Sequence, residues 1–174
     1  DVVGGKTVVL TTTNMTRAVV AAAKAGRLVV CAIVNVSAVA EALRREPRVV
    51  VLCSGFEGRV AIEDLLCGGM LLSRLGFRFG DGDLDDAARL ALLAAAEYGD
   101  RTELLLRSCE HGRRLLSLGF ERDILYCART DCSGRVPEMD GGAFCSSGSS
   151  LTRVKGNASS QLAWAGLIPY FCAI

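Results

Sequence analysis

The chain has 174 residues, of which 51% are hydrophobic and 22% charged, a composition that fits one folded core and excludes disorder over most of its length. Its 20 lysines and arginines offset 19 aspartates and glutamates, which leaves a formal net charge of +1. This balance excludes binding of nucleic acid or of an anionic membrane through bulk charge, so any anion site must be built locally.

Three strand, loop and helix units are predicted in the first 76 residues. Their strands cover 7–12, 28–34 and 48–52, and their helices cover 17–25, about 37–45 and 60–75. The strands are apolar throughout rather than alternating, as expected when helices cover both faces of a sheet. The pattern predicts a three-layer α/β/α fold with a largely parallel sheet.

Only helices are predicted between residues 81 and 128. They cover 87–98, 103–109, 110–118 and 120–128, with Gly119 as a break, and an edge strand is expected near Val136 with its limit at Pro137. Residues 145–174 have neither helical nor strand periodicity. We therefore expect one domain over 1–144, followed by a poorly ordered tail.

Cysteine usage and hydropathy indicate the compartment. Cys31, Cys53 and Cys67, three of the eight cysteines, lie in or beside apolar runs, which is typical of buried thiols in a reducing compartment. The single histidine, His111, has no partner at zinc-ligand spacing. No apolar run approaches the roughly 20 residues that span a bilayer. The sequence predicts a cytoplasmic protein without membrane partners.

Polar residues follow all three predicted strands. The carboxyl ends of parallel strands meet at one sheet edge, where helix N-termini present free N–H groups. Hydroxyl, amide and glycine N–H groups at this edge predict a site for a small oxyanion such as phosphate or sulfonate. The alternative is that each Thr, Asn or Ser only caps the helix that follows it. The candidate substrate-binding residues are Thr13, Asn14, Thr16, Asn35, Ser37, Cys53, Gly55, Gly58 and Arg59.

An acidic pair, Glu63 and Asp64, falls in the first turn of the third predicted helix, near the same edge. Carboxylates beside a phosphate pocket bind Mg2+ or act as acid and base, because phosphoryl transfer needs charge neutralisation and a positioned water. Both residues are candidate catalytic groups and metal ligands. The alternative is that they only stabilise the helix N-terminus.

The segment from Cys53 to Arg59 also matches C-x5-R, the phosphate loop of cysteine-dependent phosphatases. In that loop a thiolate attacks phosphorus while the arginine binds the phosphate oxygens. The flanking positions, which carry His and Ser or Thr in such loops, are Leu52 and Val60 here. A cysteine mechanism is therefore kept as an alternative.

Several segments in order resemble the 2-phosphosulfolactate phosphatase (ComB) family: GKTVVLTTTNMTRAV, NVSAVAEAL, VVVLCSGFEGRVAIEDLLCGGMLLSRL and RRLLSLGFERDILYCARTD. The resemblance covers about residues 5–144. It implies a Mg2+-dependent phosphatase that hydrolyses 2-phosphosulfolactate, a small anionic phospho-acid, to sulfolactate and phosphate on the route toward coenzyme M.

The family resemblance also implies that part of the enzyme lies outside this chain. Two family motifs, one like D-x-x-R-A-T-T and one like G-x-x-x-G-N-S-P, do not occur, so the chain is expected to be the C-terminal part of a longer enzyme. Activity of the chain alone is left open, with a non-catalytic anion-binding fragment as the alternative. A homo-oligomer is also left open.

Overall fold

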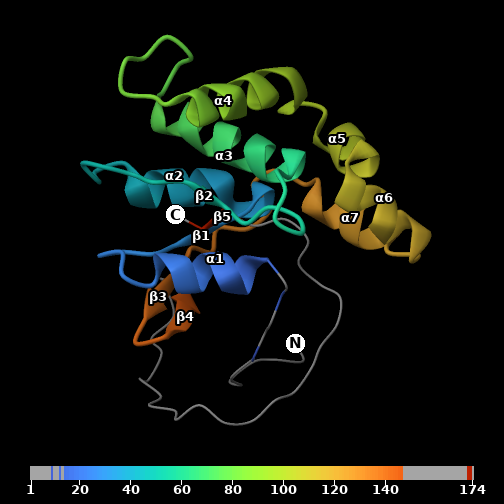
Figure 1. Ribbon diagram of the computed structural model, residues 1–174, viewed down its shortest axis with the longest axis horizontal. Coiled ribbons are helices and arrows are strands. Elements are labelled where there is room, and N and C mark those ends of the chain that lie inside the picture. The colour runs from blue at the N-terminus through green and yellow to red at the C-terminus, as the bar shows by residue number, and fades with distance from the viewer. Residues whose placement is uncertain (1–8, 10–11, 13, 147–171, 174) are drawn as a thin grey trace.

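The computed structural model describes residues 9, 12, 14–146 and 172–173. They form a mixed α/β fold, as the sequence predicted (Figure 1). In chain order its elements are α1 (Met15–Ala22), β1 (Val30–Cys31), the 3-10 turn η1 (Ile33–Asn35), α2 (Val36–Leu43), β2 (Leu52–Cys53), α3 (Ile62–Leu75), α4 (Asp86–Tyr98), α5 (Thr102–Ser108), α6 (Glu110–Ser117), α7 (Glu121–Cys127), β3 (Pro137–Asp140), β4 (Ala143–Ser146) and β5 (Cys172–Ala173). The helices agree with those predicted, apart from shifts at their ends.

Helix α3 is the central element. It lies between α4 on one side and α2 with the strands on the other (Figure 1), and α5, α6 and α7 gather beside its N-terminal end. Leu66, Cys67 and Leu71 of this helix are fully buried. A helix that is covered on several sides is apolar around most of its surface.

The described strands pair in antiparallel ladders, so the predicted three-layer fold with a largely parallel sheet is not confirmed. Strand β5 lies between β1 and β2, and Ala173 pairs with both Val30 and Leu52. β1 and β2 run in the same direction, but they are separated by β5 and do not pair with each other. Most of the predicted strand 7–12, and most of the predicted tail, lie outside the described residues.

A buried asparagine explains why β1 is shorter than predicted. The Oδ1 atom of Asn35 accepts a hydrogen bond from the Ala32 N–H at 2.7 Å. Its Nδ2 atom donates to the carbonyls of Val30 at 3.3 Å and Arg135 at 2.8 Å. These bonds stabilise the turn η1, so the extended conformation of the chain ends after Ala32.

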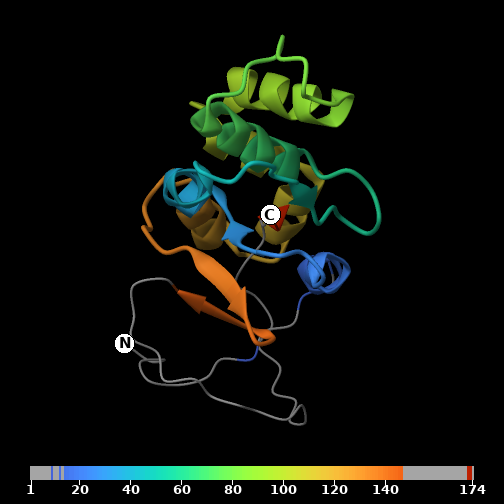
Figure 2. The same cartoon turned by 90° about the vertical axis from the view of Figure 1, so that its left-hand side faces the viewer.

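The hairpin of β3 and β4 packs below this turn (Figure 2). The Met139 N–H donates to the Leu28 carbonyl at 2.8 Å, which joins the hairpin to the segment before β1. The predicted late strand is therefore present, but it begins at Pro137 instead of ending there. Proline is tolerated at this position because the first residue of a strand need not donate to the ladder.

Asp131 connects three segments of the fold. Its carboxylate accepts hydrogen bonds from the Ser37 N–H at 2.7 Å and the Ser37 hydroxyl at 2.6 Å, and it lies 3.1 Å from the Arg74 guanidinium. Partial burial raises the pKa of Asp131, but these donors outweigh burial and hold the pKa below its ordinary value. The charged carboxylate therefore joins α2, α3 and the loop after α7.

We expect Asp131→Asn to lower the free energy of unfolding by about 1 kcal/mol at pH 7, because the amide loses the charged hydrogen bonds but tolerates the left-handed backbone here (φ 55°). A carboxyl whose pKa is lower in the folded state stabilises the fold above its unfolded pKa of about 4, and this contribution disappears as the pH falls through the folded pKa. Urea denaturation should thus give a difference at pH 7 that shrinks at pH 3. The exposed Asp83→Asn is the control, and an equal loss at both pH values would contradict this role.

Candidate active site

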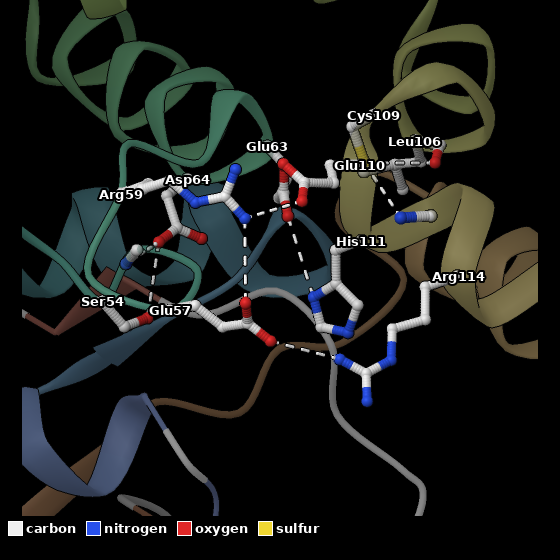
Figure 3. A network of polar contacts seen from close by, with 12 residues as sticks. Ser54, Glu57, Arg59, Glu63, Asp64, Leu106, Cys109, Glu110, His111 and Arg114 are labelled. Atoms are coloured by element: carbon white, nitrogen blue, oxygen red, sulfur yellow. Dashed lines mark hydrogen bonds and ion pairs between the residues drawn. The ribbon is translucent and has the colours of Figure 1, made fainter.

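The loop between β2 and α3 folds back onto the first turn of α3 (Figure 3). The carboxylate of Asp64 accepts hydrogen bonds from the Gly55 N–H at 2.7 Å and from the Ser54 hydroxyl at 3.4 Å. Gly55 has a φ of +70°, and a Cβ there would lie 2.6 Å from the Arg59 carbonyl oxygen, so the turn requires glycine. Burial raises the pKa of Asp64 to about 7, although these donors oppose the rise. Asp64 therefore anchors the loop to α3.

Helix α6 forms the facing side of the site (Figure 3). Each contact joins one residue of the loop to one residue of the helix. The Phe56 ring stacks on His111 with centroids 5.0 Å apart, Arg59 Nη2 donates to Glu110 Oε1 at 2.7 Å, and Arg114 Nη1 donates to Glu57 Oε1 at 3.4 Å. The site is thus assembled from the 53–59 loop, the start of α3 and α6.

Glu63 is a buried carboxylate between these elements. Its side chain is 4% exposed, and its Oε1 atom lies 3.8 Å from Nδ1 of His111, too far for a hydrogen bond. Among the described residues, no hydrogen-bond donor reaches this carboxylate. Burial lowers the pKa of His111, so its ring is largely neutral at pH 7 and does not offset the Glu63 charge. A buried charge of this kind is costly unless a cation lies beside it.

This environment fits a divalent cation. Mg2+ is typically bound through one or two protein carboxylates, with water and substrate phosphate completing its ligands. Glu63 supplies one such carboxylate, whereas Asp64 is engaged by the loop. In the part of the chain that the structure describes, no cluster of three or more His, Cys, Asp or Glu side chains could hold a metal by itself.

The structure gathers only some of the predicted binding residues around the acidic pair. Gly55, Gly58 and Arg59 lie in the loop beside Glu63 and Asp64, and half-buried Cys53 precedes it at the end of β2. Ser37 instead bonds to Arg74 at 2.6 Å. Arg74 lies ten residues beyond Asp64 on α3, which is about 15 Å along a helix. Ser37 thus lies near the other end of α3.

The remaining predicted binding residues have local roles or lie outside the described residues. Asn35 is 5% exposed and stabilises η1, as described above. Thr16 and Thr12 exchange hydrogen bonds at the start of α1, where the Thr12 N–H donates to the Thr16 hydroxyl at 3.0 Å and the Thr16 N–H donates to the Thr12 hydroxyl at 3.3 Å. Asn14 precedes α1 without capping it through its side chain. Thr13 lies outside the described residues.

Sequence reasoning missed the contribution of α6. In the sequence His111 stands out only as a possible zinc ligand, and neither Glu110 nor Arg114 has a predicted role. One signal was present: Glu110 and Arg114 are four residues apart, on one face of a helix, and their charges complement those of Arg59 and Glu57. No feature of the sequence, however, placed that helix face opposite the loop.

Comparison with known proteins identifies the family. The family model described as 2-phosphosulpholactate phosphatase matches residues 1–142. The chain belongs to this family. The matched region contains the whole loop, the acidic pair and α6, so the site described above is made from family sequence.

Curated relatives support this assignment to the 2-phosphosulpholactate phosphatase family. A "Probable 2-phosphosulfolactate phosphatase" of Thermotoga petrophila is 34% identical over 142 residues, which are 82% of this chain and 60% of the relative. One of the same name from Deinococcus radiodurans is 38% identical over 79% of this chain and 58% of its own length. The "2-phosphosulfolactate phosphatase" of Methanothermobacter thermautotrophicus is 37% identical over 76% and 56%. The chain thus spans about 60% of the length of these relatives.

Over the described residues, none of the helices has both the length and the apolar character that a membrane span needs.

Proposed function

We propose that this chain carries part of the active site of a Mg2+-dependent phosphatase that hydrolyses 2-phosphosulfolactate to sulfolactate and phosphate, a step toward coenzyme M. The observation that carries the proposal is the buried Glu63 carboxylate, which no hydrogen-bond donor reaches among the described residues. The names of the relatives supply the substrate, and the loop with its glycines and Arg59 supplies groups that suit an oxyanion.

In this proposal Glu63 holds the metal ion. Mg2+, when bound, neutralises the phosphoryl oxygens and makes a bound water a better nucleophile. Asp64 keeps the 53–59 loop in place against α3 through the Gly55 N–H and the Ser54 hydroxyl. His111, stacked on Phe56, covers Glu63 from one side and limits the access of bulk water. Preorganised charges act more strongly in such a partly dry site than in water.

The charge of the site also favours a cation. Its described residues include the carboxylates of Glu57, Glu63, Asp64 and Glu110, and the guanidiniums of Arg59 and Arg114. With His111 neutral and Asp64 only partly ionised at pH 7, the negative groups still outnumber the positive ones. Because 2-phosphosulfolactate carries ionised phosphate, carboxylate and sulfonate groups, it would be repelled unless a metal ion and the arginines offset this charge.

The test is phosphate release from 2-phosphosulfolactate by the full-length protein to which this chain belongs. We expect release that needs Mg2+, that EDTA abolishes and added MgCl2 restores, and that Cys53→Ser leaves intact. If EDTA has no effect while Cys53→Ser or thiol alkylation abolishes release, the cysteine-dependent mechanism is correct instead. Calorimetric binding of sulfolactate without phosphate release would favour the anion-binding fragment.

A further inference from the structure

Arg114 places a second guanidinium at the edge of the candidate site, beside Glu57. It lies on α6 one helical turn after Glu110, beyond the His111 ring as seen from Glu63 (Figure 3). A cation at this point lies on the side of His111 that faces away from Glu63. It could therefore reach a ligand group that extends away from the metal.

The present partner of Arg114 holds it weakly. Among the described residues Arg114 Nη1 has one acidic partner, Glu57 Oε1 at 3.4 Å, and the two side chains are 61% and 56% exposed. An exposed pair of this kind contributes about 0–1 kcal/mol, so a ligand anion can replace Glu57 at small cost. Arg59 is held more closely, by Glu110 at 2.7 Å with Glu57 also 3.8 Å away. Of the two arginines, Arg114 is the one that is easier to recruit.

The chemistry of the guanidinium suits a sulfonate. A sulfonate is ionised throughout the neutral pH range and presents three oxygens, and the planar fork of arginine can donate two parallel hydrogen bonds to such a group. The phosphate of the proposed substrate is required at Glu63, where the metal is held. The sulfonate is on the carbon next to the one that carries the phosphate. In this arrangement it binds a cation other than the metal.

We infer that Arg114 recognises the sulfonate group and sets the preference of the site for sulfonated ligands over the same ligands without sulfonate. This inference rests on the proposed function for the identity of the ligand. Arg114 exchanges Glu57 for the sulfonate when the ligand binds, and Glu57 therefore competes with the ligand.

Calorimetric titration of the chain, in MgCl2, with sulfolactate and with lactate tests the assignment, because these two ligands differ only by the sulfonate. We expect sulfolactate to bind at least about tenfold more tightly than lactate, since a charged hydrogen bond contributes about 1.5–3 kcal/mol. Arg114→Gln should remove this preference and leave the affinity for lactate unchanged. Glu57→Gln should increase the affinity for sulfolactate at least about twofold, because it releases the arginine.

The matched control is Arg113→Gln, on the same helix, because the Arg113 guanidinium donates to the Ser108 carbonyl and takes no part in the network. It should keep the preference. The assignment is overturned if the wild-type chain does not prefer sulfolactate, if Arg114→Gln keeps the preference, or if this variant weakens both ligands equally. Phosphate release by the full-length protein is measured separately: selective binding of sulfolactate without hydrolysis by that protein would overturn the proposed function and leave the role of Arg114 standing.

Discussion

Replacing Glu63 with glutamine is expected to reduce Mg2+-dependent phosphate release about a hundredfold or more while the chain remains folded. The amide has nearly the same shape as the carboxylate but carries no charge, so it cannot replace a carboxylate ligand of Mg2+. The same change removes a buried charge that no donor reaches among the described residues. In metal-free buffer the variant should therefore be as stable as the wild-type chain or more stable.

A thermal denaturation series with increasing MgCl2 measures the metal effect independently of activity. A ligand that binds only the folded state raises the Tm as its concentration rises. We expect Mg2+ to raise the Tm of the wild-type chain and to have little effect on Glu63→Gln. Glu103→Gln, which changes an exposed carboxylate of α5 paired with Arg107, is the control and should behave as wild type. A Glu63→Gln variant that keeps the full Mg2+ shift would show that the metal binds elsewhere.

The helices could be predicted from the sequence because their signals are local. Apolar periodicity, the acidic first turn of α4 and the break at Gly119 each act within a few residues. The sheet could not be predicted in the same way, since pairing depends on residues far apart in the chain. β5, at residues 172–173, separates β1 from β2, and no pattern in the first 76 residues indicates that a late segment lies between them.

In the candidate site, too, the local features could be predicted and the long-range contacts could not. Placing Glu63 and Asp64 in the first turn of a helix required only local information, and the structure confirms that position. Their environments depend on distant segments: Asp64 is held by the loop, whereas Glu63 lies against His111 of α6. A pattern of polar residues after predicted strands does not distinguish a ligand-binding group from one that joins two parts of the fold. Ser37 and Asn35 join parts of the fold, because Ser37 bonds to Asp131 and Asn35 bonds to the Arg135 carbonyl.

Gly69→Ala is expected to lower the free energy of unfolding by about 3 kcal/mol or more, the upper end of the usual cost of overpacking. Gly69 lies on the side of α3 that contacts α4, where a Cβ would be 1.8 Å from the Ala91 carbonyl oxygen and 3.0 Å from the Ala95 Cβ. The obstacle is mainly backbone, so a side-chain rotation cannot relieve it and the two helices must move apart. Such a movement would loosen the small cluster in which Leu72 packs with Ala91 and Leu92.

Helix propensity alone predicts the opposite result, because alanine is favoured over glycine inside a helix by about 1 kcal/mol. Urea denaturation therefore separates the two effects by sign. Gly80→Ala is the control, since a Cβ there meets nothing within 4 Å, and it should change stability by no more than about 0.5 kcal/mol. A Gly69→Ala chain as stable as wild type would mean that α3 and α4 do not approach this closely. Because α3 also carries Glu63 and Asp64 in its first turn, a destabilised variant that still binds Mg2+ would indicate that the site tolerates movement of α4.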